Sequence, residues 1–421
     1  MTYYQLENHT LVSDRVLPFT PISGPEPEKE LLWAFRRAPL TGRETFAVTD
    51  TALLTEREGI ETLDTGALPP VRVPPSLAEA VAAGRVRGVN LAHPRWRELL
   101  SPSFPACRPE KKLRLHLLAL GDVGATLALG LRLLGGDVLS AIGVCDLREG
   151  VARRWEFELN QIGFPDRYGD LPPVEEVDVE RIFDCDVFLF CASRFVPDTA
   201  VKTGDVRMAQ YEANRPLAAA YGRMAREKGF RGLFCVVSDP VDPLCRAALD
   251  ASNRNEAGEL DFLGLFPHQV RGFGLGVMNA RAAYYAKKEA RFADFLTDGR
   301  TFGPHGEDLV AANSISRYDD ALSRELTERT AHANLEMRQM GFKPYVAPAM
   351  SSGALSVLGC LRGEWHCSSV YLNGVFFGVR NRLTAHGPEV ERLPLPGPLA
   401  ARLEETMEKL RAIPVREGKE G

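Results

Sequence analysis

The stretch from Leu113 to Asp146 constrains the fold of this 421-residue chain more than any other. It contains a short apolar strand at 113–120, a glycine turn, an amphipathic helix and a second strand at 138–144 that ends on Asp146. This order of elements is typical of a dinucleotide-binding unit. An ordinary strand–helix corner stays open as the alternative, because Ala119 occupies the first glycine position of an A-x-G-x-x-G pattern.

The turn carries the residues that a pyrophosphate group needs. Gly121 lets backbone approach the anion, and Gly124 lets the following helix pack closely on the strand. Asp122 and Val123 open that helix, whose N-terminus provides free N–H groups and a partial positive charge. These four residues are therefore predicted to bind the cofactor.

The acid at the end of the second strand predicts the kind of dinucleotide. Asp146 lies 22 residues beyond Gly124, where it is placed to accept hydrogen bonds from an adenosine ribose. Its charge would repel a 2′-phosphate, which favours NAD as the cofactor. Arg148, two residues on, leaves NADP open.

Composition excludes several classes of protein. A net charge of −5 without a basic stripe gives no reason to expect nucleic acid, and no apolar run reaches the ~18 residues of a membrane span. The N-terminus lacks the layout of a secretory signal. The eight cysteines include no C-x-x-C pair, so neither a disulfide framework nor a metal site is expected. We expect a protein of the reducing cytoplasm.

The chain divides into three predicted parts. Residues 1–110 form an N-terminal extension of unknown role, with short helices expected at 31–37 and 76–83. Residues 111–266 alternate strands, such as 187–191 and 233–237, with helices, such as 207–227, as a dinucleotide-binding domain does.

The last part, residues 267–421, mixes helical stretches with β-rich runs and forms the substrate domain. Helices are expected at 280–291, 323–340 and 398–411, and a β-rich run at 368–379. The predicted fold class is therefore α/β, a Rossmann-type doubly wound parallel sheet followed by an α+β domain, with the substrate site between the two.

Four further motifs, at 204–214, 236–244, 274–285 and 302–314, follow in a fixed order. They read GDVRMAQYEAN, VVSDPVDPL, GLGVMNARAAYY and FGPHGEDLVAANS. In this order they resemble the lactate/malate dehydrogenase family, over roughly the last three quarters of the chain. The resemblance implies a nicotinamide-dependent oxidoreductase that acts on a small 2-oxo or 2-hydroxy acid.

The resemblance also implies a role for individual residues. His305 matches the catalytic histidine that exchanges a proton with the substrate oxygen, and Arg281 matches the arginine that holds the substrate carboxylate. Arg207 matches the mobile-loop arginine that polarises the carbonyl, and Asn214 follows seven residues later as a substrate-binding residue. Further cofactor contacts are expected from Ala192 and Ser238.

Two positions depart from the family pattern. Met278 stands where the family has the aspartate that orients the histidine, and an analogous loss in serine proteases costs about 10⁴ in turnover. Asp239 stands where the family has an asparagine that donates to the substrate oxygen. Asp239 could accept from His305 and partly replace the missing aspartate, or it could favour an amino or imino substrate. We expect its carboxylate within hydrogen-bond reach of the His305 ring.

The prediction is an NAD-dependent dehydrogenase, expected as a homo-oligomer (dimer or tetramer), that takes a small carboxylate substrate. The alternative is a nucleotide-binding regulatory or scaffold protein that kept the fold and lost catalysis. Met278 and Asp239 support the alternative, whereas His305, Arg207 and Arg281 favour the enzyme.

Overall fold

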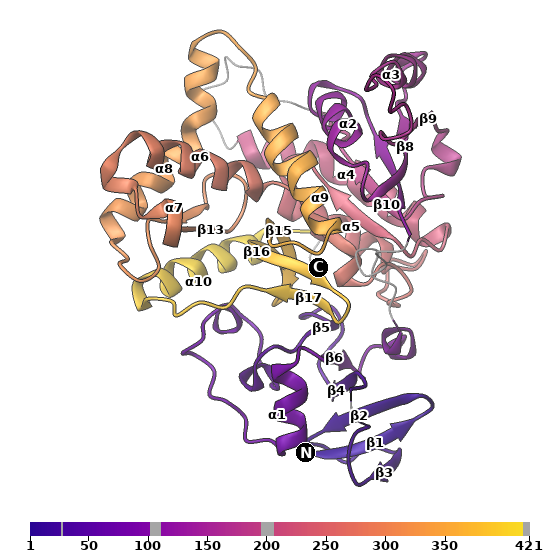
Figure 1. Cartoon of the computed structure of the whole chain (residues 1–421), viewed down its shortest axis with the longest axis vertical. Coiled ribbons are helices and arrows are strands. Elements are labelled where there is room, and N and C mark those ends of the chain that lie inside the picture. Colours follow the sequence, from indigo (N-terminus) through magenta and orange to yellow (C-terminus); the bar gives the residue numbers. More distant parts are fainter. Residues whose placement is uncertain (27, 102–110, 195–205, 416–421) are drawn as a thin grey trace.

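A nine-stranded sheet forms the centre of the molecule in the computed structural model (Figure 1). The structure describes residues 1–26, 28–101, 111–194 and 206–415, and at 206 and 207 only the backbone. The strand order is β17-β16-β15-β12-β11-β10-β7-β8-β9. The strands are β7 (Leu113–Leu118), β8 (Leu139–Cys145), β9 (Val174–Glu176), β10 (Val187–Phe190), β11 (Leu233–Val236), β12 (Val270–Gly272), β15 (His366–Leu372), β16 (Val375–Thr384) and β17 (Gly387–Val390).

The six strands from β9 to β12 are parallel in the Rossmann order, so the predicted fold class is confirmed. The predicted strands at 113–120, 138–144, 187–191 and 233–237 are β7, β8, β10 and β11, each within two residues at its ends. Strands β15 to β17 extend this sheet in antiparallel fashion. Since residues on both sides of 266 share one sheet, the division there into two domains stays a prediction.

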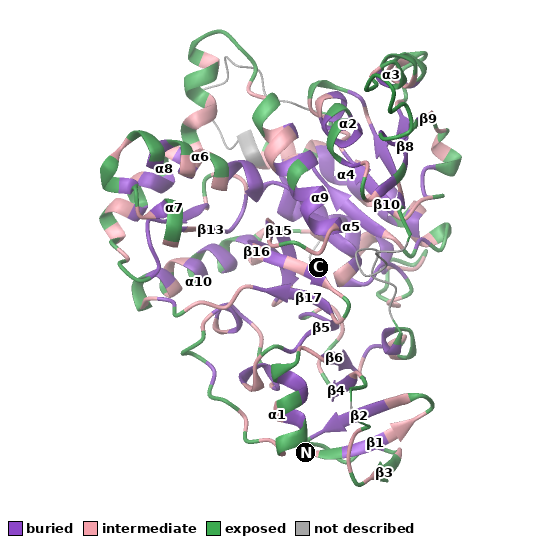
Figure 2. Cartoon of the chain, viewed as in Figure 1, coloured by how far each residue is buried: buried purple, intermediate pink, exposed green. Residues whose placement is uncertain are grey.

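Helices cover both faces of the sheet because alternate strand residues are apolar on each side. Leu117 and Leu189 share a core with Leu127 of α2, while Phe188 and Phe190 pack with Tyr211 of α4. Figure 2 shows the strands buried between the two helical layers. The layers contain α2 (Asp122–Leu134), α3 (Val151–Asn160), α4 (Val206–Glu227), α5 (Val241–Ser252), α9 (Ser356–Leu361) and the π-helical segment η8 (Pro348–Leu355).

The remaining elements of the C-terminal third pack around β15 and β16. They are α6 (Leu275–Lys288), α7 (Phe295–Asp298), β13 (Arg300–Phe302), β14 (Val310–Ala312), α8 (Asp320–Gln339) and α10 (Gly397–Ala412). The helix expected at 280–291 therefore begins five residues earlier, whereas those expected at 323–340 and 398–411 agree with α8 and α10. The β-rich run at 368–379 is the hairpin of β15 and β16.

The N-terminal region forms a second sheet, with strand order β3-β1-β2-β4-β6-β5. Its elements are β1 (Thr2–Leu6), β2 (His9–Ser13), β3 (Thr20–Ile22), β4 (Leu31–Phe35), β5 (Thr45–Ala47), α1 (Pro75–Ala82) and β6 (Val86–Asn90). The helix expected at 76–83 is α1, but the one expected at 31–37 is wrong. All five residues of β4 are buried between β2 and β6, and such a continuous apolar run carries no period that separates strand from helix.

Short 3₁₀ turns connect these elements. They are η1 (Thr51–Leu53), η2 (Ile60–Thr62), η3 (Trp96–Leu100), η5 (Val179–Arg181), η6 (Pro267–Gln269) and η7 (Ala290–Phe292). Within the described ranges, no helix is both long enough and apolar enough to cross a membrane.

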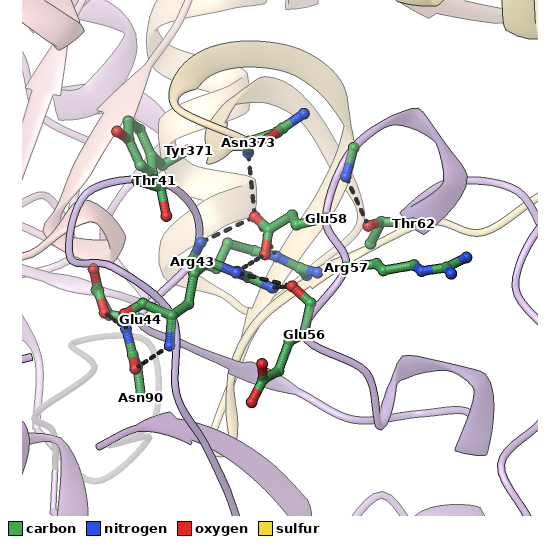
Figure 3. A network of polar contacts seen from close by, with 12 residues as sticks. Thr41, Arg43, Glu44, Glu56, Arg57, Glu58, Thr62, Asn90, Tyr371 and Asn373 are labelled. Carbon is green, nitrogen blue, oxygen red and sulfur yellow. Dashed lines mark hydrogen bonds and ion pairs between the residues drawn. The ribbon is translucent and has the colours of Figure 1, made fainter. Parts of the chain in front are cut away.

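Buried polar contacts join the N-terminal sheet to the central one (Figure 3). Glu58 forms ion pairs with Arg37 and Arg43 and accepts from the backbone N–H of Asn373 beyond β15. Burial raises the pKa of Glu58, but the two guanidinium groups outweigh this effect and hold the pKa below its usual value. The Tyr371 hydroxyl donates to the Leu40 carbonyl. This network is buried, so separating the two sheets would expose unpaired charges.

Candidate active site

The glycine turn between β7 and α2 has the close contact that its sequence predicts. A Cβ atom at Gly124 would lie 1.9 Å from the Ala119 carbonyl oxygen, so only glycine fits here. Ala119 itself adopts φ +75°, a left-handed conformation that favours the glycine of the usual pattern. Gly121 caps the N-terminus of α2, and a Cβ there would meet nothing within 4 Å. There is therefore open space beside Gly121 at the N-terminus of α2.

The first residues of α2 differ in their contacts. Val123 is half-buried against the core beneath the helix. Asp122 is exposed and pairs with Lys343, 3.1 Å away, from the chain beyond α8. Sequence reasoning missed Lys343, because no motif surrounds it and only the tertiary fold brings it to this helix N-terminus. This pairing offsets the negative charge that Asp122 places in the first turn of α2, where an anion would meet the partial positive charge of the helix.

Asp146 follows β8 and faces the glycine turn. Its Oδ2 accepts from the Leu120 N–H at 2.7 Å, and its Oδ1 accepts from the Arg148 N–H at 3.0 Å. The Arg148 guanidinium also donates to both carboxylate oxygens, at 2.9 and 3.0 Å. Burial raises the pKa of Asp146, but hydrogen bonds from Arg148 and Leu120 outweigh it and hold the pKa below its usual value. The Asp146 carboxylate thus holds the turn in place, and the Arg148 guanidinium covers this carboxylate.

Ala192 and Ser238 lie just beyond the carboxyl ends of β10 and β11. The Ser238 N–H donates to the Phe190 carbonyl at 3.3 Å, which keeps the two strand ends together. Since β7, β8, β10 and β11 are parallel, these residues lie at the same sheet edge as the glycine turn and Asp146. Ligands of open α/β sheets bind outside this edge.

His305 and Asp239 meet at that edge. His305 Nδ1 donates to Asp239 Oδ1 at 2.7 Å, as expected from the sequence. The histidine side chain is 16% exposed and the aspartate side chain 40%. Because a carboxylate only accepts, this bond fixes the proton on Nδ1 and leaves Nε2 to exchange a proton with a ligand.

The histidine reaches this place through a close approach of two segments. It lies in the loop between β13 and β14, and its Cβ would be 2.8 Å from a Cβ placed on Gly274, the residue before α6. A side chain at position 274 would therefore displace the ring from Asp239. Gly274 belongs to the same sequence motif as Arg281, so one segment supplies both the space and the arginine.

Arg281 and Met278 both lie on α6. Met278 is 1% exposed in a small core with Leu275 and Leu309, and the Arg281 guanidinium lies 3.7 Å from its sulfur. Burial lowers the pKa of Arg281, while the charge of the neighbouring Asp239 raises it and limits the shift. Among the described residues Arg281 forms no ion pair within 4 Å, so its fork can bind a carboxylate from outside.

Asn214 is fully buried on α4 and hydrogen-bonds to the loop that carries Asp239. Its amide donates to the Asp239 carbonyl oxygen at 2.9 Å, and its Oδ1 accepts from the Arg194 N–H at 2.8 Å. Ser193, which sequence reasoning did not select, exchanges hydrogen bonds with the same amide group. Asn214 thus positions the loop that carries Asp239, and its role in substrate binding stays a prediction.

One predicted site residue, Arg207, lies outside the described side chains. Its backbone forms part of the first turn of α4. In the part of the chain that is described, no cluster of three His, Cys, Asp or Glu side chains could hold a metal ion.

Comparison with known proteins finds related sequences over about half of the chain. An L-lactate dehydrogenase of Treponema denticola is 27% identical over 210 residues, which cover 49% of this chain and 59% of that protein. For L-lactate dehydrogenase 2 of Staphylococcus aureus the identity is 25% over 218 residues, covering 46% and 65%. The chain thus matches less than two thirds of the length of these relatives. No protein-family model matches it.

Solved structures match over a larger part. The minor L-lactate dehydrogenase from Enterococcus mundtii has a TM-score of 0.57 and 21% identity, covering 72% of this chain and 97% of that one. The malate dehydrogenase from Picrophilus torridus has a TM-score of 0.56 and 18% identity, covering 72% and 96%. The fold and site define a Rossmann-type α/β protein with a histidine–aspartate pair at the carboxyl edge of its sheet. Within that class, the chain is a divergent relative of the lactate/malate dehydrogenase family.

Proposed function

We propose that this protein is an NAD-dependent dehydrogenase that interconverts a small 2-hydroxy acid and its 2-oxo acid. The observation that carries the proposal is the 2.7 Å hydrogen bond between His305 and Asp239. Arg281 is near enough to Asp239 that the charge of this carboxylate raises the pKa of the guanidinium. This arrangement supports a site in which His305 exchanges a proton and Arg281 binds a carboxylate, since both residues neighbour Asp239. The related L-lactate dehydrogenases support the choice of reaction.

The residues at the glycine turn fit a dinucleotide. The space in front of Gly121 and the N-terminus of α2 would accept the pyrophosphate, and Asp146 would accept from the adenosine ribose once Arg148 moves aside. Val123, Gly124, Ala192 and Ser238 would complete the wall of the site. NAD, when bound, would supply or take up the hydride.

The chain's own residues would then manage the substrate. Arg281 binds the substrate carboxylate, ideally through two parallel hydrogen bonds. His305 Nε2 gives a proton to the carbonyl oxygen during reduction, and it takes the hydroxyl proton during oxidation. Asp239 keeps the ring oriented and stabilises its charged form, which is the role that Met278 cannot perform. Arg207 would polarise the carbonyl from α4.

A non-catalytic nucleotide-binding protein is the second candidate, because Met278 is buried where the family has its orienting acid. One experiment separates the two. Purified protein is assayed for NADH oxidation against a panel of 2-oxo acids, beside His305→Gln. Turnover that falls about 10²-fold or more in the variant supports the enzyme. NADH binding without any turnover, in both proteins, supports the second candidate.

A further inference from the structure

A small void separates the N-terminal sheet from the central sheet, and none of its lining residues belongs to the candidate active site. Its volume is about 10 Å³, the size of one water molecule or one small ion. Arg43 and Thr45 line it from the N-terminal region, whereas Val270, Arg271 and Tyr371 line it from the central sheet. Anything bound there would contact both parts of the chain.

Arg271, one of the residues that line this void, carries a charge that no carboxylate of the described residues compensates. The residue is 1% exposed, and its Nη1 donates to Asn381 Oδ1 at 2.8 Å. Its Nε and Nη2 are buried and have no hydrogen-bond partner, and among the described residues no carboxylate pairs with it. A buried guanidinium without a counter-charge is strongly unfavourable, so a partner is expected.

The other groups around the void also suit an anion. The Thr45 hydroxyl is fully buried without a partner and can donate. His268 lines the void as a neutral ring, because burial, followed by the charge of Arg271, lowers its pKa to about 3. Arg43 shares the single carboxylate of Glu58 with a second guanidinium, so this neighbour has no surplus negative charge.

We propose that this void binds one chloride ion, held by Arg271 and Thr45. A water molecule would satisfy hydrogen bonds but would leave the guanidinium charge uncompensated. A cation is excluded by the two buried arginines. A volume of about 10 Å³ favours a single monatomic anion over a polyatomic one such as phosphate.

Chloride bound here would stabilise the docking of the N-terminal sheet. An ion that binds only the folded protein raises its stability by mass action, so each tenfold increase in chloride above the Kd raises the folding equilibrium constant about tenfold. The effect is independent of NAD and of substrate.

The test measures chemical unfolding of the full chain while potassium chloride replaces potassium gluconate at constant ionic strength. We expect wild-type stability to rise with chloride. Arg271→Met should lose this response and should be more stable than wild type when chloride is absent, because a buried unpaired charge has been removed. Thr45→Val should keep the response but need about tenfold more chloride.

Arg87→Met is the matched control. Arg87 is also 1% exposed, but it pairs with Glu30 and donates to two backbone carbonyls, so its variant should be less stable and still respond to chloride. Crystals grown in bromide should show an anomalous peak beside Arg271, a readout that needs no variant. Equal stability of wild type in both salts, the same chloride response in Arg271→Met, or a water molecule without a bromide peak would overturn the proposal.

Discussion

The carboxylate of Asp239 accepts a hydrogen bond from Nδ1 of His305 at 2.7 Å, although 66 residues separate the two. Asp239 comes from the end of β11, whereas His305 comes from the loop after β13. In the proposed enzyme this aspartate would take the role that the resemblance to lactate/malate dehydrogenases assigns to an aspartate at position 278. The orienting acid would then have moved from a helix to a strand end.

Asp239→Asn tests this role directly. Asparagine can accept the Nδ1 proton but cannot stabilise a charged ring, so turnover with 2-oxo acids should fall about 10²- to 10⁴-fold. The pH–rate profile should also move to lower pH, because the protonated ring has lost its counter-charge. Steady-state kinetics between pH 5 and 9 measure both effects. Higher activity in the variant would instead mean that Asp239 selects an amino or imino substrate.

Arg281→Lys tests the carboxylate site. Lysine keeps the charge but loses the planar two-point contact, so KM for 2-oxo acids should rise about tenfold or more. Neutral carbonyl compounds serve as the control, and their kcat/KM should change little. If acids and neutral compounds lose activity alike, the arginine supports the fold around Met278 and does not contact substrate.

Asp146→Ala should weaken NADH binding by about 10- to 100-fold, because a charged hydrogen-bond partner of the ribose is lost. The turn also loses its brace at Leu120, so NADPH binding is measured in parallel. A larger loss for NADH than for NADPH assigns Asp146 to the ribose. Equal losses would assign it to the brace alone, and a preference of wild type for NADPH would assign Arg148 to a 2′-phosphate.

Glu44 should make stability depend on pH. The residue is 1% exposed, its carboxylate accepts from the Asn90 amide, and burial raises its pKa from 4.5 to about 7 (Figure 3). The folded state therefore favours the protonated acid. This contribution is complete below pH 4.5 and is lost as pH rises through 7, on the order of 3 kcal/mol. Chemical unfolding from pH 4.5 to 8 should show a flatter dependence in Glu44→Gln, and an unchanged slope would contradict the assignment.

The parallel half of the fold follows from the sequence because its signals are local. Strands such as Val187–Phe190 are short apolar runs between polar residues, and α4 is a long helical pattern. The antiparallel extension by β15 to β17 and the sheet of the N-terminal region depend on pairing between distant segments. The buried strand β4 shows the limit, since its apolar run fits a strand or a helix equally well.

The candidate site divides in the same way. The contact between Asp239 and His305 could be expected because each residue lies in a motif with a fixed place in the family fold. Three other contacts could not be expected from the sequence, because no motif defines the partners of the side chains involved. They are the bonds of Arg148 to Asp146, the ion pair of Lys343 with Asp122 and the hydrogen bonds of the Asn214 amide. Each of these contacts depends on the tertiary fold, which brings the two partners together.

The last prediction restores the family arrangement. Met278→Asp, added to Asp239→Asn, places a carboxylate on α6 one turn before Arg281, where the family has its orienting acid. Met278 is buried, so this carboxylate is expected to ionise beside the guanidinium, whose fork is within 3.7 Å of the present sulfur. Turnover of 2-oxo acids should recover relative to Asp239→Asn alone, and KM should rise only moderately because the new acid competes with substrate for Arg281. Met278→Asn on the same background is the control, since it matches the shape without the charge. Equal activity of the two double variants would show that position 278 cannot orient His305 in this protein.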